Sequence, residues 1–192
     1  GVDTSAIQTF LITVTPVNDA PAGADRTVTA LEDVPFAFNA ADFGFSDPLD
    51  SPANTLQSVV ISTLPAAGTL RLSGVAVAAG QEITAAQIPS LTYTAPANAN
   101  GNNLANFTFQ VRDNGGTANG GINLDPSPNR ITVNVTPVND APLISGLDAI
   151  SPNATAANPY VQGGAAVVID PDATLFDQEL SAADNWNGST LT

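Results

Sequence analysis

The segment NFTFQVR, residues 106–112, decides the fold class of this 192-residue chain. Phe107, Phe109 and Val111 alternate with polar residues, and a period of two places these three side chains on one face of a β-strand. A strand with one apolar and one polar face is typical of a sheet that covers a core on one side. The segment therefore predicts a half-buried strand.

Further short segments on both sides of it have strand character, and turn residues separate them. With 15 Gly and 15 Pro, long uninterrupted helices are not expected, and we predict only helical turns near residues 40–45 and 84–88. The additional predicted strands are residues 26–31, 34–38, 56–64, 68–72, 75–77, 90–94 and 129–136. Seven or more short strands favour an all-β fold, a two-sheet antiparallel β-sandwich.

The octapeptide VTPVNDAP occurs twice and reveals a long repeat. The copies begin at Val14 and Val135, 121 residues apart (14 to 135), and the apolar alternation before each copy falls at the same offset. One motif per period of that length indicates whole domains in series rather than solenoid turns. We therefore expect a linear tandem array in which each copy follows the last strand of a domain.

The repeat divides the chain into three parts. Residues 1–16 are predicted to be the last strand of a preceding repeat, residues 17–137 a complete repeat, and residues 138–192 the first part of a following, incomplete sandwich. Two prolines in each linker remove backbone donors and favour an extended path, so the linker is expected to be stiff. The true ends of the protein are expected to lie beyond this sequence.

Charge limits the possible partners. The chain has 18 acidic residues against four Arg and no Lys, a net charge of −14. Nucleic acid and anionic membrane surfaces are disfavoured as partners, because binding phosphate needs a basic stripe. Insertion into a membrane is not expected either. Clustered Asp, Asn and backbone carbonyl oxygens suit Ca²⁺, a hard cation with oxygen ligands. The alternative reading of the acidic residues is solubility.

The missing residue types argue against catalysis. Without Cys and His, and without Lys, the chain has no disulfide, no thiolate metal site, no Lys-based isopeptide cross-link and few nucleophile-and-base combinations. Paired carboxylates such as Asp177 and Glu179 could act as acid and base only in a concave pocket that raises a pKa. We expect a protein that is not an enzyme.

The linker also resembles that of a known family. VNDAP is similar to the DxNDNxP linker of cadherins, and LED, FTFQVRDNGG and VTPVNDAP together resemble the cadherin-like tandem repeats of large bacterial surface and secreted adhesins. The resemblance implies an extracellular or cell-surface bacterial protein whose rod-forming repeats bind Ca²⁺ at their junctions. Ala20 and Ala141 stand where the cadherin linker has its final Asn, and ANANGNN replaces an acidic motif, so we expect about one or two ions per junction.

The order of strands predicts which polar residues gather at each end of the complete repeat. Carboxylates that converge from segments distant in sequence could supply the six to eight oxygens that Ca²⁺ takes. At the entry end these are Asn18, Asp19, Asp47, Asp50 and Asp113; at the exit end they are Glu32, Asp33, Asn139, Asp140, Asp177 and Glu179. Each group also has a simpler reading, because Asn and Asp are common turn residues.

Three functions remain open. The first is a Ca²⁺-rigidified spacer repeat of a bacterial adhesin, whose partners are neighbouring repeats of the same chain. The second is a filament or sheath subunit, in which residues 7–14 form a strand donated to another copy. The third is a carbohydrate- or receptor-binding module, which would need an exposed aromatic platform built from Trp186, Tyr160 or Tyr93.

Overall fold

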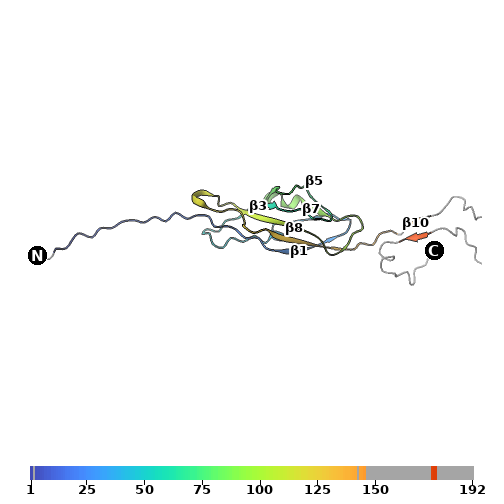
Figure 1. Ribbon diagram of the computed structural model, residues 1–192, viewed down its shortest axis with the longest axis horizontal. Coiled ribbons are helices and arrows are strands. Elements are labelled where there is room, and N and C mark those ends of the chain that lie inside the picture. Colours follow the sequence, from blue (N-terminus) through green and yellow to red (C-terminus); the bar gives the residue numbers. More distant parts are fainter. Residues whose placement is uncertain (2, 142, 146–173, 177–192) are drawn as a thin grey trace, which may run out of the picture.

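The protein forms a two-layer β-sandwich. The computed structural model describes residues 1, 3–141, 143–145 and 174–176 (Figure 1). One layer is a five-stranded sheet in the order β1-β9-β8-β3-β6, and the other is a four-stranded sheet in the order β2-β7-β4-β5. The predicted all-β sandwich is thus confirmed for the repeat that spans these strands.

The strands are short, apart from β8, and three 3-10 helical turns connect some of them. The five-stranded sheet contains β1 (Arg26–Leu31), β3 (Leu56–Ile61), β6 (Glu82–Thr84), β8 (Gly101–Asp113) and β9 (Asn129–Thr136). The four-stranded sheet contains β2 (Phe36–Ala37), β4 (Thr69–Leu72), β5 (Val75–Ala76) and β7 (Leu91–Thr94). The turns are η1 (Ala40–Phe43), η2 (Ala85–Ser90) and η3 (Ala118–Gly120).

One pair of strands departs from the predicted antiparallel arrangement. β1 and β9 pair in parallel, with Arg26 opposite Ile131 and Leu31 opposite Thr136, whereas the other pairs of both sheets are antiparallel. A parallel pair needs a long crossover between its strands, and here the whole remainder of the sandwich provides it. The first strand of the domain therefore lies beside the last.

The alternating residues that predicted β8 face the core. Phe107, Phe109 and Val111 are fully buried between the sheets. Phe107 packs edge-on against Phe38, with ring centroids 5.7 Å apart, and Phe109 packs edge-on against Phe43 at 4.9 Å. These aromatic contacts join the long strand to the segment around η1 and so connect the two layers.

The sequence analysis missed β6 and the beginning of β8. Glu82–Thr84 has one buried residue, Ile83, which is too short a pattern for the alternation to be recognised. The loop predicted at residues 97–103 contains the start of β8, where Gly101 pairs with Val135 before an irregularity in the register. Asn103 adopts φ 53° there, a left-handed conformation that Asn tolerates, so polar loop residues continue the strand.

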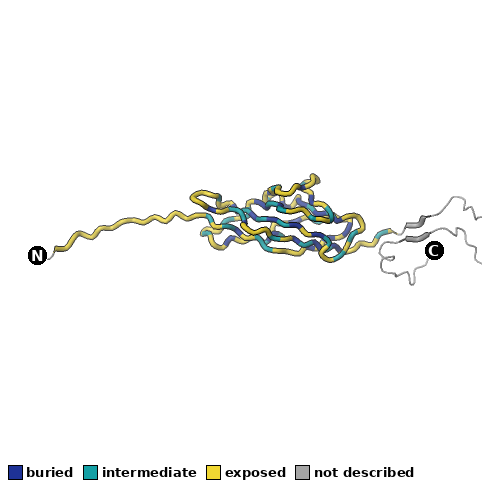
Figure 2. The backbone as a smooth tube through the Cα atoms, in the orientation of Figure 1, coloured by how far each residue is buried: buried dark blue, intermediate teal, exposed yellow. Residues whose placement is uncertain are grey.

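Outside the sandwich, two segments are described. Residues 3–17 have no regular secondary structure and extend away from the domain as an exposed chain (Figure 2). Residues 143–145, β10, pair antiparallel with residues 174–176, β11. Apart from these two strands and residues 138–141, the following sandwich predicted at residues 138–192 lies outside the described residues.

Phe107→Ala should destabilise the sandwich strongly. The substitution leaves a cavity at the contact between the layers, and truncation of a buried Phe costs about 3–5 kcal/mol of the free energy of unfolding. Asn106→Ala, on the exposed face of the same strand, is the control and should change that free energy by less than about 0.5 kcal/mol. Urea denaturation followed by circular dichroism measures both, and equal effects would contradict the assignment of the faces.

Candidate functional site

At the entry end of the sandwich, the linker docks through the side chain of Asn18. Its Nδ2 donates to the backbone oxygen of Ile122 at 2.6 Å and lies 3.3 Å from both carboxylate oxygens of Asp113. The backbone oxygen of Asn18 accepts from the Ile122 amide at 3.0 Å. Asn54 donates to Asn18 Oδ1, which fixes which way the amide group points. The linker is therefore bonded to two loops of the domain.

Two glycines make room for Asn18. A Cβ added to Gly115 would lie 1.5 Å from Asn18 Oδ1, and one added to Gly121 would lie 3.0 Å from Asn18 Cβ. Gly115 N–H also donates to Asp113 Oδ1 at 2.8 Å, which shapes the turn. We call the space bounded by Gly115, Gly121, Asn54 and Asp113 the asparagine slot.

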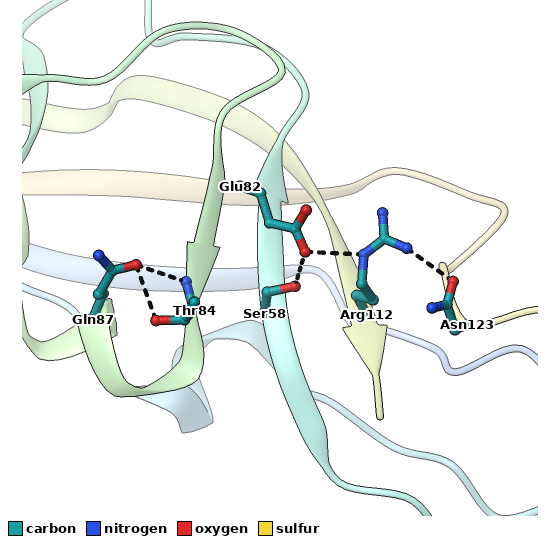
Figure 3. Close-up of polar contacts among 6 residues, drawn as sticks. All are labelled: Ser58, Glu82, Thr84, Gln87, Arg112 and Asn123. Atoms are coloured by element: carbon teal, nitrogen blue, oxygen red, sulfur yellow. Dashed lines mark hydrogen bonds and ion pairs between the residues drawn. The ribbon is translucent and has the colours of Figure 1, made fainter. Parts of the chain in front are cut away.

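A polar network on the outer face of the five-stranded sheet positions the loop that carries the slot (Figure 3). Arg112 donates through Nη1 to Asn123 Oδ1 at 2.9 Å, and its Nε lies 3.0 Å from Glu82 Oε1. Ser58 Oγ donates to the same Glu82 oxygen. The Arg112–Asn123 bond ties the residue after Ile122 to β8, so the loop cannot move freely away from Asn18.

The other acidic residues of the entry end lie beside the slot. Asp50 Oδ2 accepts from the Asp19 backbone N–H and from Asn54 Nδ2, both at 3.1 Å. Asp47 is only 6% exposed, and neither of its carboxylate oxygens accepts a hydrogen bond from the described residues. Burial, and then repulsion from Asp50 and Asp113, raises the pKa of Asp47, and the nearby Asn54 amides offset only part of that effect.

At the exit end, Glu32 holds the following linker. Its side chain is fully buried, Oε1 accepts from the Val138 N–H at 2.8 Å, and Oε2 accepts from Asn100 Nδ2 at 2.8 Å. The Glu32 N–H donates to the Thr136 carbonyl at 3.0 Å. The turn after β1 thus contacts the chain at two points where it leaves β9.

The remaining exit-end candidates are arranged less tightly. Asp33 has φ 58°, and its Oδ1 is 3.4 Å from the Asn98 N–H. Asn139 Nδ2 donates to the Asp140 carbonyl at 2.9 Å, just as Asn18 Nδ2 contacts the Asp19 carbonyl at 3.1 Å. The two copies of the linker therefore share a local turn. The candidates Asp177 and Glu179 lie outside the described residues.

The described residues contain no group of three or more His, Cys, Asp or Glu side chains that converge closely enough to hold a metal ion. Asp50 and Asp113 nevertheless lie close enough to Asp47 to raise the pKa of its carboxyl group. The two observations are compatible, because electrostatic repulsion acts over longer distances than coordination. A Ca²⁺ ion at this end would therefore need backbone or amide oxygens in addition to the carboxylates.

Sequence reasoning missed four residues that complete these contacts: Asn54, Asn100, Gly115 and Gly121. It assigned the first to a loop, and it placed the other three in polar or glycine-rich loops. A pattern of glycines spaced around an Asp can indicate close approach of another chain segment, but only the fold identifies Asn18 as that segment.

Other surfaces have little chemistry. An open cavity of about 350 Å³ is lined in part by Pro21, Asp125 and Asn129. The Asp125 carboxylate there already accepts from Gly23 N–H, Ser127 N–H and Asn129 Nδ2. Tyr93 is fully buried, so it cannot serve as a binding platform, and Tyr160 and Trp186 lie outside the described residues. Among the described residues, no helix has the length and apolar character needed to span a membrane.

Gly115→Ala should expel Asn18 from its slot. The new Cβ would overlap Asn18 Oδ1, so we expect the loss of the Asn18 hydrogen bonds and a decrease of about 1–3 kcal/mol in unfolding free energy. In hydrogen exchange, the Ile122 N–H should lose protection. The matched control is the same substitution in an Asn18→Ala background, where its cost should largely disappear. Additive costs of the two substitutions would show that the glycine serves another purpose.

Comparison with known proteins agrees with the sandwich fold. A family model, the bacterial Ig domain, matches residues 18–125, and no curated protein matches the chain significantly. The matched segment begins at Asn18, the residue that occupies the slot, and contains eight of the nine strands of the two sheets; β9 follows it. Domains of this family are typical of surface and secreted proteins and are generally non-catalytic. The chain belongs to the bacterial Ig domain family.

Proposed function

We propose that this domain is a spacer repeat of a bacterial surface or secreted adhesin, joined to its neighbours by short, stiff linkers with a cadherin-like character. The observation that carries the proposal is that the domain holds a copy of the same linker at each end. It binds Asn18 of the entering linker and the Val138 amide of the leaving linker. A domain whose function lay in a pocket would not require both contacts.

Because the linker sequence repeats, both contacts belong to the same junction between two domains. Val138 and Asn139 correspond to Val17 and Asn18, 121 residues earlier (17 to 138). At a junction, the Val is therefore held by a glutamate of the preceding domain, and the next residue, Asn, enters the slot of the following domain. These two linker residues are consecutive, so no residue lies between the contact with the preceding domain and the contact with the following one. Such a joint restricts bending even before any ion binds.

Ca²⁺ strengthens the entry end of this joint in our proposal. Asp47 fits a cation because its carboxylate is buried and faces repulsion from two other carboxylates, which the nearby Asn54 amides offset only in part. Asp47, Asp50 and Asp113 would hold the ion, with Asn18 and Asp19 as the linker's contribution. The ion supplies positive charge to a chain that has four Arg and no Lys against 18 acidic residues.

The pKa of Asp47 gives a signed prediction. For a carboxyl group whose pKa is raised on folding, the free energy of unfolding falls as the pH rises from the unfolded value of 3.8 to the folded pKa, and the loss then stays constant at higher pH. Asp47→Asn should therefore raise the melting temperature at neutral pH in the presence of chelator, and it should abolish the stabilisation caused by Ca²⁺. Asp3→Asn, the same charge change in the exposed segment, is the control and should leave the Ca²⁺ response intact. Thermal unfolding with and without Ca²⁺ measures both effects. A wild-type melting temperature that is indifferent to Ca²⁺ would refute the ion site.

Glu32→Ala should loosen the exit linker. The substitution removes the acceptor of the Val138 N–H, while Glu32→Gln retains an acceptor oxygen without the charge. The chain has no native cysteine, so paired cysteines at Thr29 and Ala141 can carry spin labels without background. We expect a broader distance distribution for Glu32→Ala and a nearly native width for Glu32→Gln. An unchanged width in the alanine variant would contradict the joint.

A further inference from the structure

The segment before the first linker has the pattern of a core strand but none of its burial. In the complete repeat, the inward residues of β9 are Ile131, Val133 and Val135, which are 0%, 0% and 3% exposed. Their equivalents 121 residues earlier are Phe10, Ile12 and Val14, which are 84%, 71% and 83% exposed. Figure 2 shows the N-terminal segment exposed as it extends away from the domain, whereas buried residues lie inside the sandwich.

The position of β9 specifies what the earlier segment would need. β9 lies inside its sheet, with β1 on one side in parallel and β8 on the other side antiparallel. An interior strand forms backbone hydrogen bonds along both of its edges, so one neighbouring strand cannot supply partners for all of these groups. A sandwich of the same kind without its own β9 offers both of these edges.

We propose that residues 8–15 are the last strand of a second bacterial Ig sandwich of this repeat type, that of the preceding repeat in the same chain. Phe10, Ile12 and Val14 take the core positions of Ile131, Val133 and Val135. The segment enters between the equivalents of β1 and β8. This inference rests on the tandem arrangement of the proposed function, but it concerns the sheet rather than the joint.

On the opposite face of the segment, Thr13 keeps the polar character of its equivalent, whereas Leu11 is apolar where the equivalent is Thr. Leu11 corresponds to Thr132, which is partly exposed on the outer face of β9, and Thr13 corresponds to Asn134 on the same face. The domain described here cannot accept the segment, because its own β9 fills the place. The partner is therefore a sandwich that lacks a closing strand, which is what a repeat encoded immediately before this segment would be.

A longer chain tests the assignment directly. Residues 17–121 are duplicated in front of Gly1, so that residues 10–14 follow the added copy at the native offset. Hydrogen exchange should show protection of the backbone amides of residues 10–14. Calorimetry should show the enthalpy of unfolding of two sandwiches. Exchange of these amides at the rate of an unfolded chain would overturn the proposal.

Variants within the longer chain separate the register from simple collapse. Ile12→Asp, which places a charge in the added core, should abolish the protection of residues 10–14 while the original sandwich stays folded. Leu11→Asp, on the outer face, should leave the protection in place. Equal loss in both variants would overturn the register.

The original chain distinguishes a partner in the same chain from one in another copy. Analytical ultracentrifugation should find it monomeric, with rapid exchange at residues 10–14. A dimer in which these amides are protected would instead show donation between copies and would overturn the assignment to a preceding repeat. Spin-label distances test the proposed linker contacts, whereas hydrogen exchange tests the insertion of the strand. Either proposal can therefore be refuted without the other.

Discussion

The constraint on which the structure depends is the double role of β9. This strand lies between β1 and β8, carries three side chains into the core, and continues without interruption into the linker. Its register therefore sets both the packing of the sandwich and the point at which the chain leaves the domain. Glu32 can reach the Val138 amide only because the parallel pairing of β1 with β9 brings the two strand ends together.

The same logic applies at the entry end, where polar side chains rather than apolar ones fix the geometry. An amide nitrogen from Asn18 reaches a buried carboxylate and a backbone carbonyl, which is the electrostatic role that a small cation could also play. Asn18 thereby compensates one carboxylate, Asp113. Asp47 receives only partial compensation, from the nearby Asn54 amides. This difference is why the proposed ion site is centred on Asp47 and not on Asp113.

Much of the fold could be read from the sequence because burial imposes period two on the strands. The boundaries of β1 and β9 follow from alternation. The parallel pairing of β1 with β9 could not be read, because alternation reports which face is buried and not which strand lies alongside. The slot was also inaccessible to sequence reasoning. Gly115 has the composition of an ordinary turn, and its importance comes from an asparagine 97 residues away (18 to 115).

The parallel pairing of β1 and β9 has a mechanical consequence. Tension along the chain would pull β1 from its beginning and β9 from its end, in opposite directions along the same axis. Six residue pairs, from Arg26 opposite Ile131 to Leu31 opposite Thr136, join these strands. Their hydrogen bonds would be loaded together in shear rather than broken one after another. A sandwich connected in this way resists stretching far better than one whose end strands could peel apart, which suits a protein that transmits force.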